Sequence, residues 1–110
     1  MPHPFRKRRA AHLRLGRRGE QIAVRLLEYL NCDVIIRNYQ VKDGEIDIVA
    51  RDGPVLCFVE VKTLHKPVYA RPADAVGHEK KQRLARAAHQ YRRELGFPAI
   101  ADRNNIIEII

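Results

Sequence analysis

Apolar residues recur at two different spacings along the chain, and these spacings predict helices and strands in turn. Residues 16–30 and 73–95 repeat apolar side chains every three or four positions, the period of an amphipathic helix. The stripe of the first helix consists of Ala23, Leu27 and Leu30, widened by Ile22 and Leu26. The stripe of the second consists of Val76, Leu84, Ala88, Tyr91 and Leu95. We expect the first helix to end at Asn31, and the second at Gly96 and Pro98.

Shorter segments rich in branched residues predict four strands. Residues 34–39, 45–50 and 55–63 are separated by turn signals at residues 42–44 and 51–54, so we expect an antiparallel meander. Residues 64–72, which contain two prolines, are predicted to form a loop, and residues 106–110 a final strand. The order helix, three strands, helix, strand predicts an α/β domain with a sheet flanked by helices.

Length and charge narrow the class of protein. A chain of 110 residues fits one domain, and we assign residues 16–110 to it and residues 1–15 to a flexible basic arm. Lys and Arg number 21 against 13 Asp and Glu, and the net charge of +8 predicts a polyanionic partner, nucleic acid before an anionic membrane. The candidate phosphate-binding residues are Arg6, Lys7, Arg8, Arg9, Arg17, Lys80 and Lys81. A solvated tail and a solvated helix face are the alternatives for them.

The distribution of apolar residues predicts a cytoplasmic protein without a membrane partner. No apolar segment follows the basic N-terminus as in a signal peptide, and no apolar run has the length needed to span a bilayer. Cys32 and Cys57 lie beside apolar residues and form no C-x-x-C pair. We therefore expect two buried free thiols, as in a reducing compartment.

Charged residues within two of the predicted strands form the candidate site. Because strand side chains alternate, Glu60 and Lys62 share one face, and Asp47 joins them in either of two hairpin registers. With a four-residue loop at residues 51–54, Asp47 faces Phe58 and lies diagonal to Glu60. With the strands slipped by two residues, it lies directly opposite Glu60. Both registers bring two carboxylates and an ammonium group together.

These residue types suit metal-assisted hydrolysis. Adjacent carboxylates repel each other unless a cation lies between them, and hard oxygen ligands favour Mg²⁺ or Mn²⁺ over zinc. Lys62 could then orient an attacking water and stabilise developing negative charge. Glu20, on the stripe of the first helix, could face the sheet near Asp47. The alternatives are ordinary salt bridges on a solvated face, and for Glu20 an acid in the first helical turn.

Taken together, several motifs resemble the uncharacterised bacterial YraN family. They are Gly16-Arg17-Arg18-Gly19-Glu20, Arg37-Asn38-Tyr39, Gly44-Glu45-Ile46-Asp47-Ile48-Val49-Ala50, Phe58-Val59-Glu60-Val61-Lys62-Thr63, and Ala75-Val76 followed by Lys80-Lys81. That family resembles the PD-(D/E)XK nucleases, and within them the archaeal Holliday-junction resolvases. The resemblance implies a restriction-endonuclease-like αβββαβ core with a mixed sheet, a divalent metal such as Mg²⁺ or Mn²⁺, and a nucleic-acid substrate.

The same resemblance implies roles for individual residues. Asp47 and Glu60 would be metal ligands together with the main-chain carbonyl of Val61, Lys62 would be the catalytic lysine, and Glu20 would assist the metal or its waters. In two departures from the pattern, Ile46 replaces the proline of the superfamily name, and Asn104-Asn105 replaces an aromatic residue and an acid in the last strand. The second raises the question of how that strand packs.

The function expected from this resemblance is a metal-dependent endonuclease that hydrolyses phosphodiester bonds in DNA, including branched or junction structures. The alternative is a non-catalytic nucleic-acid-binding module with the same fold, because a fold alone does not fix a function. By analogy with resolvases, which act in pairs on symmetric junctions, a homodimer is also expected.

Overall fold

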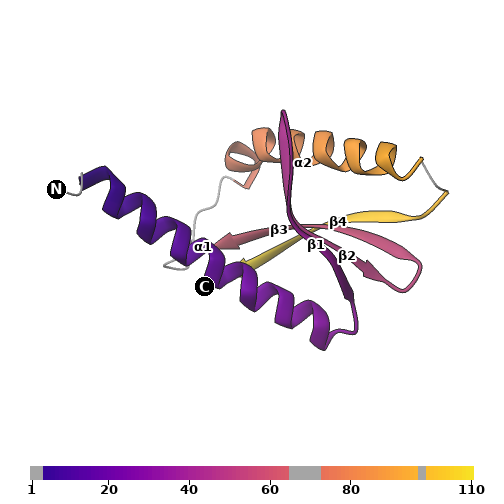
Figure 1. Ribbon diagram of the computed structural model, residues 1–110, viewed down its shortest axis with the longest axis horizontal. Helices are drawn as coiled ribbons and strands as arrows, with labels where there is room; N and C mark the ends of the chain where they lie inside the picture. Colours follow the sequence, from indigo (N-terminus) through magenta and orange to yellow (C-terminus); the bar gives the residue numbers. More distant parts are fainter. Residues whose placement is uncertain (1–3, 65–72, 97–98) are drawn as a thin grey trace.

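The computed structural model confirms the predicted order of elements (Figure 1). These are α1 (Pro4–Tyr29), β1 (Asp33–Val41), β2 (Gly44–Asp52), β3 (Val55–Thr63), α2 (Ala73–Glu94) and β4 (Asp102–Ile109). The structure describes residues 4–64, 73–96 and 99–110, with side chains from residue 17 onward and, in α2, from residue 78 onward. The loop predicted at residues 64–72 falls almost wholly outside the described residues.

Helix α1 begins earlier than its apolar stripe indicates, at Pro4 instead of residue 16. Residues 4–15 therefore fall within the bounds of the helix, and their role as a separate arm stays a prediction. Its end agrees with the sequence, because Asn31 adopts a left-handed φ of 63°. The amide of Asn31 donates to the carbonyl of Glu28 at 3.0 Å, and that of Cys32 to Leu27 at 2.8 Å. This is the Schellman pattern of a helix C-terminus.

The four strands form one mixed sheet in the order β1-β2-β3-β4. The first three make the expected antiparallel meander, and β4 runs parallel to β3 after the α2 crossover. Strand β4 begins at Asp102 and not at residue 106, and Asn104 and Asn105 pair with Phe58 and Val59 of β3. The two asparagines therefore do not interrupt the pairing, because a parallel ladder needs only their backbone groups.

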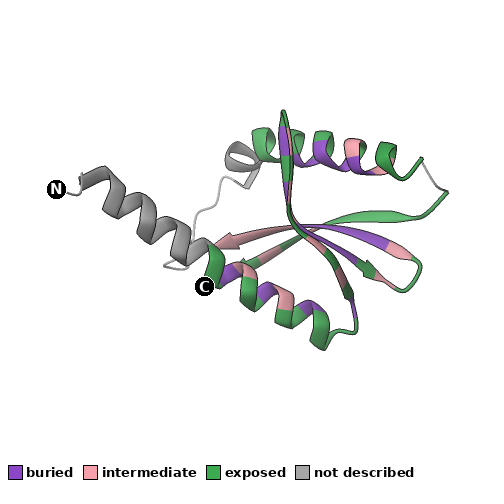
Figure 2. Ribbon diagram, in the orientation of Figure 1, coloured by how far each residue is buried: buried purple, intermediate pink, exposed green. Residues whose placement is uncertain are grey.

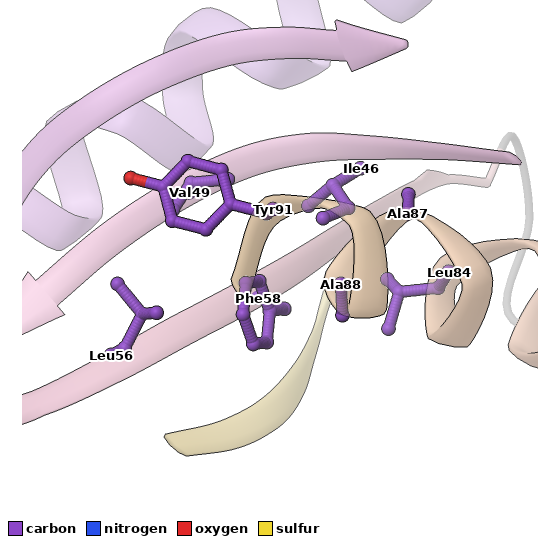
Figure 3. Close-up of a cluster of buried hydrophobic side chains, with 8 residues drawn as sticks. All are labelled: Ile46, Val49, Leu56, Phe58, Leu84, Ala87, Ala88 and Tyr91. Carbon is purple, nitrogen blue, oxygen red and sulfur yellow. The ribbon is translucent and has the colours of Figure 1, made fainter. Parts of the chain in front are cut away.

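Each helix covers one face of the sheet with its own apolar cluster. On the α1 face, Ala23 and Leu27 pack with Ile48, Cys57 and Val59, while the free thiol of Cys32 is buried beside them. The α2 face carries the cluster drawn in Figure 3, which consists of Ile46, Val49, Leu56, Phe58, Leu84, Ala87, Ala88 and Tyr91. Its central residue is Tyr91, whose ring makes edge contacts with Tyr39 and Phe58 at centroid distances of 5.4 and 6.1 Å.

The buried stripes are narrower than the sequence predicts. Ile22, Leu26 and Leu30 of the first stripe are exposed, since one sheet face covers only a narrow strip of a helix. Leu95 is exposed because it follows the last residue of α2. Figure 2 shows the resulting pattern, with buried positions on the side of each helix that faces the strands. Within the described residues, neither helix is long and apolar enough to cross a membrane.

The sheet divides into two arms beyond the middle of β2 and β3. The β2–β3 ladder stops at the pair Ile48 and Val59. Past this point β1 and β2 stay paired to their turn at Val41 and Gly44, and β3 stays paired with β4 as far as Thr63 and Ile109. We call the gap between the two arms the fork. In Figure 1 the β1–β2 hairpin rises toward α2, and β3 and β4 continue toward α1.

Two glycines allow each arm to approach its helix closely. A Cβ atom on Gly44 would overlap the backbone carbonyl of Arg83 in α2, and one on Gly19 of α1 would overlap the side chain of Thr63 at the end of β3. Arg86 adds a hydrogen bond from its guanidinium to the carbonyl of Asp43, at 3.2 Å. The hairpin is thereby packed on one helix and the β3–β4 arm on the other, which keeps the fork open.

Replacing Gly44 by alanine tests this packing. The new methyl group meets backbone atoms of α2 that cannot rotate away, so we expect the free energy of unfolding to fall by about 1–3 kcal/mol, as in other overpacked sites. Urea denaturation measures it. As the control, Gly53→Asn introduces a side chain into open space at a φ of 57° that asparagine tolerates, and it should change stability little. Equal effects of the two variants would contradict the close approach.

Candidate active site

Asp47 and Glu60 are the first residues beyond the last β2–β3 pair, so they lie across the fork from each other. The second of the two predicted registers is therefore correct, and the four-residue loop is wrong. The turn contains only Gly53 and Pro54, because β2 continues to Asp52, which pairs with Val55. The glycine supplies the positive φ of 57° that so short a turn requires.

The carboxylate of Asp47 bridges the two arms. Its Oδ2 accepts a hydrogen bond from the backbone amide of Val61 at 2.8 Å, which replaces the ladder bond that the fork has removed. Burial raises the pKa of Asp47 above its usual range, the Val61 bond opposes that shift, and the charges of Glu45 and Glu60 add to it. Asp47 is thus held firmly in an environment that disfavours its charge.

Glu60 and Lys62 follow the alternation expected for β3. Val59 and Val61 pack on the α1 side, so Glu60 and Lys62 are directed to the α2 side. The side chain of Glu60 is only 13% exposed, and its Oε1 lies 3.8 Å from Nζ of Lys80 on α2. Lys62 lies two residues beyond Glu60 in β3 and is half-buried.

Glu20 reaches the fork from the other face of the sheet. It directly follows Gly19, the point of close approach between α1 and β3, and it is half-buried. Burial and then the negative charge of Asp47 raise the pKa of Glu20, whereas a hydrogen bond from the side chain of Asn38 lowers it. Glu20 is therefore close enough to Asp47 for the charge of one to affect the pKa of the other.

Two residues of the site had been given no role from sequence. Glu45 lies two positions before Asp47, contributes to the negative potential there, and pairs with Arg83 at 4.0 Å. Asn38 is opposite Asp47, between the pairs that Arg37 and Tyr39 make with β2. The spacing Glu-x-Asp could have indicated the first residue, but no local pattern indicates the contact of Asn38 with a helix.

The predicted phosphate-binding residues fall into two groups. Arg17 is exposed on α1, and Lys80 and Lys81 are exposed on α2, so the helices on both faces of the sheet carry exposed cations. Lys80 also makes the ion pair with Glu60. The side chains of Arg6, Lys7, Arg8 and Arg9 lie outside the described residues.

The donors at the fork suit a hard cation that keeps most of its waters. Among the described side chains, no group of three or more His, Cys, Asp or Glu residues is arranged to hold a metal ion by itself. Asp47, Glu60 and the carbonyl of Val61 are instead two carboxylates and one backbone oxygen. Mg²⁺ is typically bound by one or two carboxylates together with waters and substrate phosphate, and a partly buried carboxylate with a raised pKa gains from such a counterion. The residues therefore fit the expected ion.

Comparison with known proteins agrees with the motifs that surround this fork. Residues 19–109 match the model of a family described as Uncharacterised protein family UPF0102. The chain belongs to this family. The match begins at Gly19 and includes every strand, α2 and the residues of the fork, and it confirms the family resemblance seen in the sequence.

Curated members of the family are similar over most of their length. A UPF0102 protein of Symbiobacterium thermophilum is 42% identical over 96 residues, which cover 87% of this chain and 81% of the relative. One from Streptomyces griseus is 49% identical over 84 residues, with coverages of 76% and 71%. A third, from Chlorobaculum tepidum, is 41% identical over 96 residues, with coverages of 87% and 74%. These names state a family and no activity.

The raised pKa of Asp47 predicts a particular dependence of stability on pH. Because the folded pKa lies above the unfolded one, the folded state binds the proton more tightly, and stability falls as the pH rises through the folded pKa. Asp47→Asn keeps an acceptor for Val61 and removes this charge. We expect it to increase the free energy of unfolding at pH 7, by less than about 1 kcal/mol because water partly screens the site, and to have little effect at pH 3.

Urea unfolding at the two pH values measures this difference. Asp43→Asn is the matched control, because it removes the same charge from an exposed turn residue. A variant of Asp47 that is less stable than the wild type at pH 7 would mean that the carboxylate contributes to folding and is not a strained part of a site.

Proposed function

We propose that this protein is a Mg²⁺- or Mn²⁺-dependent endonuclease that hydrolyses phosphodiester bonds in DNA, with branched or junction structures as the favoured substrates. The observation that carries the proposal is the hydrogen bond from the Val61 amide to Asp47. It joins β2 to β3 just beyond the last pair of their ladder, and it holds Asp47 in the fork across from Glu60. A purely structural sheet has no need of two carboxylates in such a gap.

Within this proposal Asp47, Glu60 and the carbonyl of Val61 hold the ion. Bound there, Mg²⁺ would supply neutralisation of phosphate charge and a more acidic bound water. Glu60 is well suited to the role because its side chain is only 13% exposed, so its charge is screened less by solvent. Glu20, on the opposite face, contributes a further negative charge close to Asp47 and orients waters of the site.

Lys62 is the residue proposed to act on the reacting groups. Alternation directs it to the same side of β3 as Glu60, two positions further toward the end of the strand. An ammonium group at this place orients the attacking water and stabilises the negative charge that develops on the phosphate oxygens. Lys80, which is 58% exposed, pairs with Glu60 and is free to exchange this partner for a phosphate of the substrate.

The charge of the chain supports a polyanionic substrate. The net charge is +8, and α1 and α2 both carry exposed cations. Contacts to phosphates give affinity that is largely independent of sequence, which suits an enzyme that recognises the shape of branched DNA. We further propose a cytoplasmic location and a homodimer, because a symmetric junction offers two equivalent strands to two equivalent sites.

Cleavage assays with two variants test the proposal. Glu60→Gln removes a ligand charge with little change of shape, and Lys62→Ala removes the ammonium group. We expect each to lower the cleavage rate by at least about 100-fold with Mg²⁺ or Mn²⁺, since each removes a group that acts on the transition state. Affinity for DNA should change little, because the many other cations supply most of it. The substrates are labelled duplex, single-stranded, flap and four-way-junction DNAs.

Two further variants provide matched controls. Glu79→Gln and Lys42→Ala make the same changes at exposed positions of α2 and of the β1–β2 turn, and they should cut at the wild-type rate. If the wild type binds these DNAs and cuts none of them, the nuclease proposal is wrong and a nucleic-acid-binding module takes its place. A Glu60 or Lys62 variant that still cuts would show that the reacting residues lie elsewhere.

A further inference from the structure

Asn38 interrupts the regular extended backbone within β1 at the level of the fork, although the strand itself continues to Val41. Its φ of 55° lies in the left-handed region, which residues other than glycine rarely adopt and which asparagine tolerates best. Ladder pairs on either side of it join Arg37 to Ile48 and Tyr39 to Ile46, so Asn38 faces Asp47 across the hairpin. The interruption is therefore next to the carboxylate that bridges the two arms.

The interruption reverses which face of the hairpin each residue occupies. Ile36 and Tyr39, three positions apart, both pack against the α2 cluster, and so do Ile46 and Val49. In a regular strand, residues three apart lie on opposite faces. Both strands thus change faces between these positions. Ile46 is directed to α2, and Asp47 turns into the fork, where its carboxylate meets the amide of Val61.

The side chain of Asn38 makes a second contact, with α1. Its amide faces the carboxylate of Glu20, and the orientation with nitrogen toward the carboxylate satisfies both groups, whereas oxygen there would be repelled. In that orientation it donates to Oε1 at 3.2 Å and to Oε2 at 3.3 Å. Glu20 is thereby held at the fork by β1, independently of the fixed position of α1 at Gly19.

We infer that Asn38 is a positioning residue with two separable roles: its backbone directs Asp47 into the fork, and its amide holds Glu20 beside Asp47. The first role requires only the left-handed conformation, and the second requires only the side chain. One residue thereby fixes acids from β2 and from α1 relative to each other. The effect of Asn38 on metal affinity rests on the proposed function. Its effect on the positions of Asp47 and Glu20 does not.

The two roles are separated by Asn38→Gly and Asn38→Ala. Glycine keeps the left-handed conformation and loses the amide, whereas alanine loses both. The signature of the backbone role is the amide proton resonance of Val61, which a bond to a carboxylate shifts downfield in a ¹H–¹⁵N NMR spectrum. We expect it to stay at its wild-type position in Asn38→Gly and to move upfield in Asn38→Ala.

The matched control for strain is Asn31→Ala. Asn31 has a similar φ of 63° but lies at the end of α1, so alanine there should lower the folding equilibrium constant about tenfold and leave the Val61 resonance unchanged. If Asn38→Ala leaves the Val61 resonance in place, or if Asn38→Gly moves it upfield, the backbone role is overturned. An upfield shift in the glycine variant overturns the backbone role even if the alanine variant does not fold.

The amide role is measured by a double-mutant cycle with Glu20→Gln in urea unfolding. We expect the folding equilibrium constants to show a coupling of about fivefold between Asn38→Gly and Glu20→Gln, since a charge-assisted bond at a half-exposed position is partly screened. A coupling indistinguishable from zero would overturn this role. The measurement needs no metal, so it decides the role of Asn38 whether or not the protein binds an ion.

Calorimetric titration with Mn²⁺ then links Asn38 to the site. If the wild type binds Mn²⁺, Asn38→Gly should raise the dissociation constant about fivefold, because Glu20 is no longer held beside Asp47. Equal affinities would overturn the contribution of Asn38 to metal binding. A wild type without measurable Mn²⁺ binding would instead remove the proposed function, while the NMR shift and the cycle still decide the positioning roles.

Discussion

The separation of β2 from β3 beyond Ile48 and Val59 is the constraint on which the candidate site depends. Splitting a sheet exposes backbone groups that a continuous ladder would pair, and such groups are expensive to leave unpaired when buried. The protein meets this requirement by replacing one ladder bond with the contact between the Val61 amide and Asp47. The hydrogen bond that satisfies the Val61 amide also holds the Asp47 carboxylate in the fork. Folding and the proposed chemistry of the site therefore depend on the same hydrogen bond.

The fork is kept open by packing and is electrostatically unfavourable. One arm packs on α2 at Gly44 and the other on α1 at Gly19, so closing the fork would separate both from their helices. Within it, Asp47 and Glu20 have raised pKa values because burial and neighbouring carboxylates disfavour their charges. A structural site would avoid that arrangement. Unfavourable charge held in place by the rest of the fold is typical of sites that bind a cation or carry out chemistry.

The sequence predicts the element order, the meander and, in one of its two registers, Asp47 opposite Glu60, because these follow from periodicity and turn residues. It does not predict that β4 starts at Asp102, since Asn104 and Asn105 carry no strand pattern and are paired only through their backbones. The change of faces at Asn38 was also missed. Alternation assumes a regular strand, and the left-handed backbone of Asn38, which the sequence pattern does not reveal, breaks that regularity. The hairpin register stayed open because two turn lengths fitted the same four residues.

The central claim is that a divalent cation binds in the fork between Asp47 and Glu60. A crystal structure determined with Mn²⁺, with data collected at a wavelength where manganese scatters anomalously, tests it most directly. The account predicts one strong anomalous peak within bonding distance of both carboxylates and of the carbonyl of Val61, at about 2.0–2.3 Å for hard oxygen ligands. A structure at saturating Mn²⁺ with no peak in the fork, and with Lys80 still paired to Glu60, would contradict it.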